Sequence, residues 1–241
     1  MNSRLSSEQI KAEAKALGFF ACGIAKAAPV PASCADQFRR WLDAGGHAGM
    51  NYMERNVEKR LDPTLLMPGV KSIVCVALNY APGRKLPDGE PQIASYALGQ
   101  DYHDIVKSRL HTLASRLGIT AYRAFCDTAP VLERYWAEQA GLGWTGRNHQ
   151  LIIPHAGSMF FLGELFLDIE LEYDSPVPSH CGTCHACMDA CPTGALTYNG
   201  QMCSARCLSY LTIEHRGDLP VDIAEKADNC IYGCDRCQDA C

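Results

Sequence analysis

The chain has 241 residues, and 47% of them are hydrophobic, which is enough for one large domain or two modest ones with a substantial core. The formal net charge is −5, so overall charge gives no support for a nucleic-acid partner, which a basic chain would favour. Met1–Leu5 has no charged-then-apolar pattern, and no apolar run reaches membrane-spanning length. We therefore expect a cytoplasmic protein without a membrane partner, in which the fourteen cysteines indicate metal sites rather than disulfides.

Helices and strands are predicted to alternate through most of the chain. The capping-box pattern at Ser6–Gln9 predicts the start of a helix that Gly18 closes. The apolar, β-branched run 72–78 predicts a strand covered on both faces. Periodicity predicts further strands over 19–25, 120–126, 150–153 and 160–171, and further helices over 35–44, 102–117 and 130–140. This alternation predicts an α/β (α+β) fold for the first part of the chain.

Asp127 lies between the predicted strand 120–126 and the predicted helix 130–140. Ligands of open α/β sheets gather at the carboxyl ends of strands, so Asp127 is a candidate catalytic acid. Alternatively, Asp127 or Thr128 is the N-cap of the helix, because Asp-Thr-x-Pro is typical of a helix start. Arg134, further along, either neutralises an anionic ligand or is a solvated helix residue.

The stretch Gly141–Asn148 is dense in glycine, which would let its backbone approach a flat or phosphate-bearing ligand. It lacks the G-x-G-x-x-G spacing of dinucleotide-binding loops, so a nicotinamide cofactor is not favoured. His103 and His155 stand apart from other candidate ligands, which is more typical of structural histidines.

Two cysteine runs near the end of the chain carry the strongest signal. Residues 181–192 read C-x2-C-x2-C-x3-C-P, and residues 234–241 read C-x2-C-x3-C. In bacterial ferredoxins the first three cysteines of such a run hold one [4Fe–4S] cluster and the fourth holds its neighbour. The spacing therefore predicts one cluster on Cys181, Cys184, Cys187 and Cys241, and a second on Cys191, Cys234, Cys237 and one further thiolate.

The eighth thiolate is left open by the spacing. A complete second run would have cysteine at position 231, where this chain has isoleucine. The ligand must then be Cys203, Cys207 or Cys230. Zinc usually pairs two C-x2-C knuckles, and nothing indicates the export that a disulfide framework would need, so neither alternative is favoured. Because domains rarely end on a cluster ligand, as this chain does at Cys241, we expect a fragment of a longer protein.

Motifs along essentially the whole chain match one family. They include Tyr52–Asn56, Asp101–His103, Asp127–Arg134, Gly141–Trp144, Cys181–Cys184 and Cys207–Gly217. In these motifs the chain resembles epoxyqueuosine reductase, the cobalamin-dependent iron–sulfur enzyme of queuosine tRNA modification. The resemblance implies a cobalamin-binding domain over residues 1–173 and a ferredoxin-like domain with two [4Fe–4S] clusters over residues 174–241. Family members continue into helical repeats that help to hold the tRNA, in line with the expected fragment.

The resemblance also implies an activity and its residues. It implies an oxidoreductase, acting as a monomer, that reduces epoxyqueuosine to queuosine at the tRNA wobble position with electrons from an external low-potential donor. It makes Cys207 the eighth cluster ligand and Asp127 the proton donor. Motif position adds cobalamin contacts at Asp127, Arg134, Asn148, Ser209 and Arg216.

Two other functions are weaker readings of the sequence. A different corrinoid and iron–sulfur reductase, of the dehalogenase type, would normally carry an export signal. A ferredoxin-type electron carrier would leave the long α/β region unexplained.

Overall fold

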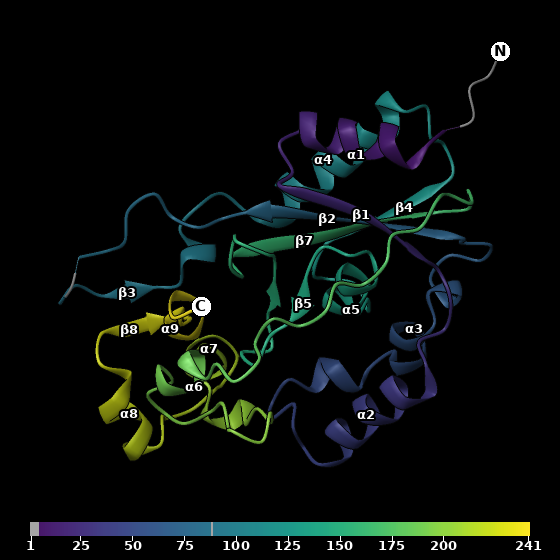
Figure 1. The fold of residues 1–241 in the computed structure, drawn as a ribbon. Helices are drawn as coiled ribbons and strands as arrows, with labels where there is room; N and C mark the ends of the chain where they lie inside the picture. Colours follow the sequence, from purple (N-terminus) through teal and green to yellow (C-terminus); the bar gives the residue numbers. More distant parts are fainter. Residues whose placement is uncertain (1–4, 88) are drawn as a thin grey trace.

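A four-stranded antiparallel sheet forms the centre of the computed structural model, which describes residues 5–87 and 89–241 (Figure 1). Its strands are β1 (Ala21–Lys26), β2 (Ser72–Asn79), β7 (Phe160–Leu167) and β4 (Tyr122–Phe125), in the order β1-β2-β7-β4. Every neighbouring pair in this sheet is antiparallel. Two parts of the chain lie outside the described residues. They are Met1–Arg4, where no leader pattern was expected, and Asp88, in the predicted surface loop.

Helices cover both faces of the sheet. In Figure 1, α1 (Ser7–Ala16) and α4 (Tyr102–Arg116) lie above it, and α5 (Glu133–Gln139) lies below. The α1 and α4 side forms one apolar core with one face of β2 and β7. The α5 side forms a second core, which also takes in residues of α2 (Ala32–Asp43) and α3 (Val57–Leu61). The first six residues of β2 are buried, so the expectation of a strand covered on both faces is confirmed.

One difference from the predicted elements lies just after Asp127. The predicted helix 130–140 begins only at Glu133, and its N-cap is Leu132 without any side-chain capping bond. The N-cap alternative for Asp127 and Thr128 is therefore wrong. The sheet is also antiparallel, so the rule on strand ends in parallel sheets does not explain the position of Asp127. At the start of the chain, by contrast, the predicted capping box at Ser6 and Gln9 is present.

The glycine-dense stretch forms a hairpin. Its strands are β5 (Trp144–Thr145) and β6 (Leu151–Ile152), which pair antiparallel. A Cβ atom at Gly143 would lie 2.0 Å from the carbonyl oxygen of Ile152, so only glycine fits there. Gly143 is thus needed for the close approach of the hairpin's own backbone and not for a ligand.

The cysteine runs lie in a compact module of short elements at the end of the chain. These are α6 (Ala186–Asp189), α7 (Leu208–Ile213), α8 (Val221–Ala227), β8 (Cys230–Tyr232) and α9 (Arg236–Asp239). Two of them, α6 and α9, begin inside the two cysteine runs and pack against each other. Among the described residues, the module has a small apolar cluster centred on Leu208, Leu211 and Ile223.

A parallel strand pair joins this module to the first part of the chain. β3 (Gln92–Ile93) pairs with β8, and the backbone N–H of Ser95 donates to the Asp235 carboxylate at 2.6 Å. Gly233 has φ +70°, and a Cβ atom there would lie 2.4 Å from that of Ala94. The polar segment after β2 therefore leads into a docking strand, which its composition did not predict.

Short 3₁₀ turns complete the fold. They are η1 (Asn51–Glu54), η2 (Pro63–Leu65), η3 (Ser95–Ala97) and η4 (Ser204–Arg206). Over residues 5–87 and 89–241, no helix combines the length and apolar character needed to cross a bilayer.

Candidate functional site: two thiol quartets and an aspartate loop

The first predicted thiol quartet is assembled in the structure. Burial raises the pKa of Cys241, and the neighbouring thiols of Cys181, Cys187 and Cys184 raise it further. Cys187 is affected in the same way by Cys181 and Cys184. The final residue thus joins the three cysteines of the first run, although the two segments are far apart in the sequence.

The second quartet gathers around Cys237. Burial raises the pKa of this thiol to about 12, and the next contributions come from Cys234, Cys207 and Cys191. Cys207, at the start of α7, in turn feels both Cys234 and Cys191. Cys191 of the first run therefore belongs with the second run, as the ferredoxin spacing predicts.

The geometry separates the three candidates for the eighth ligand. Cys207 lies among all three other members of the second quartet. Cys230 reaches Cys234, and its Sγ donates to the Gly233 carbonyl oxygen at 2.7 Å. Cys203 is exposed. Contacts alone therefore favour Cys207.

The thiols of each quartet are spread apart. Among the residues the structure describes, no three His, Cys, Asp or Glu side chains converge closely enough to hold one metal ion. A zinc ion would draw its thiolates to about 2.3 Å from a single centre, whereas a cubane gives each thiolate its own iron. The quartets are thus compatible with clusters.

Asp127 is presented on a strained loop beyond β4. Its φ is +58°, a left-handed conformation that few non-glycine residues adopt. One carboxylate oxygen accepts from the Tyr102 hydroxyl at 2.6 Å and lies 3.1 Å from Nε2 of His103. The other ring nitrogen of His103 lies 2.7 Å from Asp101. Four polar groups at the start of α4 and the end of β4 are therefore connected.

Tyr102 is held so that it can act as the donor. Its ring stacks on Phe161 of β7 with centroids 4.2 Å apart. Burial, and then the hydrogen bond to Asp127, raise the pKa of the Tyr102 phenol far above its usual range. The phenol therefore keeps its proton at physiological pH and donates a hydrogen bond, which the Asp127 carboxylate accepts.

Side chains from both parts of the chain face Asp127. Burial and the Glu214 carboxylate raise the pKa of Tyr52 to about 12, and Asp127 adds to that shift. Burial and Tyr232 raise the pKa of Tyr96, where Asp127 and Glu214 also contribute. Because Tyr232 and Glu214 belong to the cysteine module, Asp127 lies where the two parts meet.

The other predicted contact residues lie on separate segments. Asn148 is buried; its Oδ1 accepts from the Gln150 N–H at 3.1 Å, and its Nδ2 has no partner. Arg134 donates to the carbonyl oxygen of the adjacent His149. Ser209 is half-buried on α7, and exposed Arg216 donates to the Ile213 carbonyl oxygen at 3.0 Å.

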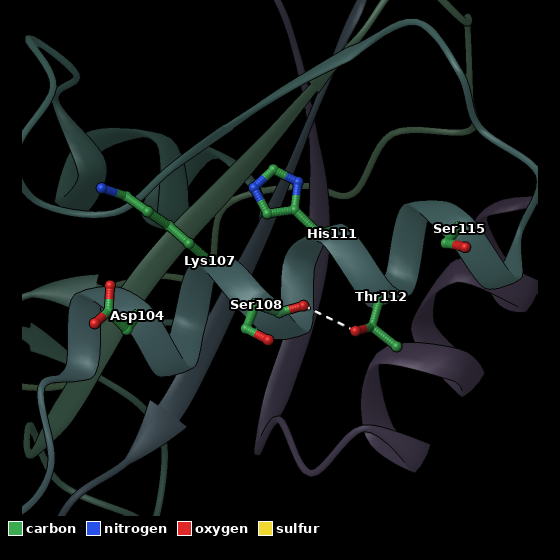
Figure 2. A pocket seen from close by; sticks show the side chains of 6 residues that line it. All are labelled: Asp104, Lys107, Ser108, His111, Thr112 and Ser115. Atoms are coloured by element: carbon green, nitrogen blue, oxygen red, sulfur yellow. Dashed lines mark hydrogen bonds between the residues drawn. The ribbon is translucent and has the colours of Figure 1, made fainter.

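Two surface hollows lie away from Asp127. The larger, of about 650 Å³, runs along the outer side of α4, as Figure 2 shows. Its lining mixes one carboxylate, one ammonium and neutral polar groups: Asp104, Lys107, Ser108, His111, Thr112 and Ser115. The second, of about 430 Å³, lies between the 82–98 segment and residues 228–239. Cys230 and Cys234 line this second hollow, whereas Asp127 lines neither of the two.

Comparison with known proteins identifies the family. The model of epoxyqueuosine reductase QueG, DUF1730, matches residues 60–128, and that of a 4Fe–4S double cluster binding domain matches residues 180–241. The epoxyqueuosine reductase of Cellulophaga algicola is 43% identical over 239 residues, covering 98% of this chain and 78% of that protein. The chain belongs to the epoxyqueuosine reductase family. The resemblance in its motifs, the α/β (α+β) fold and the two-cluster module are thereby confirmed.

Solved epoxyqueuosine reductases share the fold. One, crystallised with an epoxyqueuosine-modified tRNA-Tyr stem loop, matches with a TM-score of 0.85 and 34% identity over 97% of this chain. The Bacillus subtilis enzyme, solved with its aspartate-containing catalytic loop swung out of the active site, matches with the same three values. In both comparisons the chain spans 64% of the length of the solved enzyme. The domain boundary near residue 173 stays a prediction.

The structure adds residues to this epoxyqueuosine reductase site that sequence reasoning missed. His103, expected to be a structural histidine, contacts Asp127. Tyr102 lies in the motif Asp101–His103, but the sequence assigns it no role. The glutamates near Asp127 match no catalytic pattern, although Glu164 stands out as one charged residue in the apolar run 160–167. Trp144, in the hairpin, reaches Cys181 of the first quartet.

Trp144→Phe is expected to make the first cluster harder to reduce. The indole Nε1 donates to the Cys181 Sγ at 3.3 Å, and hydrogen bonds to cluster sulfurs raise reduction potentials because they stabilise negative charge. We expect about a ten-fold shift in the one-electron equilibrium, about 59 mV, measured by potentiometric EPR titration. Trp136→Phe is the control, since Trp136 is also buried but its Nε1 has no hydrogen-bond partner. An unchanged potential in Trp144→Phe would contradict this effect.

Proposed function

We propose that this chain reduces epoxyqueuosine to queuosine at the wobble position of tRNA, with cobalamin and two [4Fe–4S] clusters as cofactors. Electrons come from an external low-potential donor. One observation carries the proposal: in a chain of this family, the Asp127 carboxylate is presented where the sheet domain meets the cysteine module. The relative bound to an epoxyqueuosine-modified stem loop supports tRNA as the substrate.

The proposed cluster ligands follow the two quartets. The first cluster takes Cys181, Cys184, Cys187 and Cys241, and the second takes Cys191, Cys207, Cys234 and Cys237. The mutual electrostatic influence of these thiols supports this division. When bound, the clusters supply single electrons at low potential.

One buried polar group of the hairpin fits a ligand such as a corrinoid. Asn148 is buried with an unpartnered Nδ2, an orphaned donor of the kind that a ligand's amide or phosphate would satisfy. Arg134, Ser209 and Arg216 add donors from α5, from α7 and from just beyond α7. We propose that these four residues and Asp127 contact the cofactor. When bound, cobalamin supplies the electron transfer that breaks the carbon–oxygen bond.

Asp127 is the proposed proton donor. Conversion of an epoxide to an alkene takes up two electrons and two protons and releases water. The epoxide oxygen is a poor leaving group as an alkoxide, so an acid must protonate it. Tyr102 and His103 both reach the same carboxylate oxygen of Asp127, and they orient the other oxygen away from α4.

The loop of Asp127 is expected to move. In the Bacillus subtilis enzyme the aspartate-containing catalytic loop was swung out of the active site. By similarity, we propose that the Asp127 loop alternates between an inner and an outer position. Its strained φ and its 57% exposed carboxylate are in line with a loop that leaves its place easily.

The test is anaerobic reconstitution followed by EPR and a turnover assay. We expect about eight irons per chain, as two cubanes require, and a perturbed Co(II) signal when cob(II)alamin is added. Turnover is then measured by mass spectrometry as queuosine formed in an epoxyqueuosine-modified tRNA stem loop. Eight irons with only a free-cobalamin signal would reject the proposed reductase in favour of an electron carrier.

A further inference from the structure

A carboxylic acid lies buried at the centre of the sheet. Glu164 on β7 is 0% exposed and pairs with Cys75 of β2 and Phe125 of β4. Neither of its carboxyl oxygens forms a hydrogen bond of good geometry. An ionised carboxylate in such a place is very costly, so the group needs either a proton or a partner.

The partner is Glu133, the first residue of α5. Side chains alternate along β7, and Glu164 shares its face with Leu162 and Phe166, which pack in the α5-side core. The side chain of Glu164 therefore points toward the start of α5. Burial, and then the charge of the neighbouring Glu133, raise the pKa of Glu164 well above its ordinary value. Burial also raises the pKa of Glu133.

Glu133 in turn holds the Asp127 loop. Its Oε1 accepts the backbone N–H of Asp127. This hydrogen bond satisfies the backbone N–H of Asp127, which has a left-handed conformation and lies outside any helix or strand. A chain of contacts therefore runs from the centre of the sheet through two carboxyls to the backbone of the proposed acid.

We propose that Glu133 and Glu164 form a carboxyl pair that shares one proton and acts as a positioning device, fixing the Asp127 loop in its inner position. The inference rests on the proposed role of Asp127. Protonated Glu164 donates to the Glu133 carboxylate, and this carboxylate then accepts from Asp127. Two neighbouring buried carboxylates repel each other when both are ionised, so loss of the shared proton releases Glu133 from the loop.

Other charged or titratable groups near the pair do not replace this partner. The groups that face it from the surrounding elements are Arg60, Cys75, Tyr102, Cys126, Asp127 and Arg134. The two guanidinium groups are turned to carbonyl oxygens, Arg60 to that of Tyr52 and Arg134 to that of His149. Within the described ranges, neither glutamate forms an ion pair closer than 4.0 Å.

The device predicts a loop that loosens at alkaline pH. Both pKa values are raised, so the pair still holds a proton at neutral pH and loses it as pH rises. Glutamine at position 164 donates to Glu133 at every pH and has no proton to lose. The Glu164→Gln variant should therefore keep the loop fixed where the wild type releases it.

Hydrogen exchange of the Asp127 loop tests this without any assay of activity. Cluster-loaded wild type and Glu164→Gln are compared from about pH 6 to pH 9 through the protection factor of the peptide that covers residues 126–132. We expect wild-type protection to fall about ten-fold or more at the alkaline end, as loss of a hydrogen bond to a charged group implies, and Glu164→Gln to retain it. Glu170→Gln, an exposed glutamate just beyond β7, should follow the wild type.

A second variant keeps the test decisive if Glu164→Gln folds poorly. Glu133→Ala removes the acceptor and should lower protection of the loop at every pH. The inference is overturned if Glu133→Ala leaves protection unchanged, or if wild type and Glu164→Gln show the same pH dependence. Normal turnover by Asp127→Asn would reject the proposed acid instead, while the exchange data would still report on the carboxyl pair.

Discussion

Asp127→Asn is expected to lower the rate of queuosine formation by about 10²- to 10⁴-fold, the range that a general acid contributes. Asparagine keeps the shape of the side chain and can still accept a hydrogen bond from Tyr102, but it has no acidic proton for the epoxide oxygen. The loss should appear in single-turnover experiments with reduced enzyme, because it affects the chemical step. Iron content and the Co(II) EPR signal should stay as in the wild type.

Asp104→Asn is a matched control for that experiment. Asp104 lies on α4 near Tyr102 and His103, but its side chain lines the outer hollow and not the Asp127 site (Figure 2). This variant should turn over like the wild type. If Asp127→Asn also turned over normally, Asp127 would not be the proton donor, and another acid near the site, such as Tyr102, would have to be tested.

Helices and strands were predicted well where a short stretch of neighbouring residues carries the whole signal. The capping box at Ser6 and the apolar run 72–78 contain their own helix and strand signals, and both elements form as predicted. The helix after Asp127 starts later than its sequence suggests because Glu133 is committed to the Asp127 N–H and the segment before it follows the loop. The β3–β8 pair was missed because strands of two and three residues have no periodicity to detect.

The grouping of most thiols was the most predictable part of the site. The first run supplies three neighbouring thiols of one quartet and the second run supplies two of the other through tight local loops, so spacing carries this information, whereas the position of Cys207 came from the fold. The aspartate site is different, since Tyr102 and His103 reach Asp127 across 25 and 24 residues. A pattern search has no period for such contacts. Glu164 did leave a signal, because a glutamate in an otherwise apolar strand must have a partner or a proton.

Cys207→Ala is expected to remove the second cluster and with it the electron supply to the site. Cys207 lies among Cys191, Cys234 and Cys237, so its loss leaves one cubane with three thiolates. Anaerobically reconstituted protein should fall from about eight irons per chain to about four, since the first quartet is untouched. Queuosine formation should fall to background, because both clusters belong to the proposed electron supply.

Cys203→Ala and Cys230→Ala separate a ligand role from a general sensitivity to cysteine loss. Cys203 is exposed, and Cys230 donates to the Gly233 carbonyl oxygen, so both variants should retain about eight irons. Cys230→Ala is the more stringent control, because Cys230 also lies beside Cys234, a proposed ligand of the second cluster. If Cys230→Ala lost four irons while Cys207→Ala kept all eight, the second cluster would be held from β8 rather than from α7. The docking strand β3 would then be paired directly with a ligand-bearing strand.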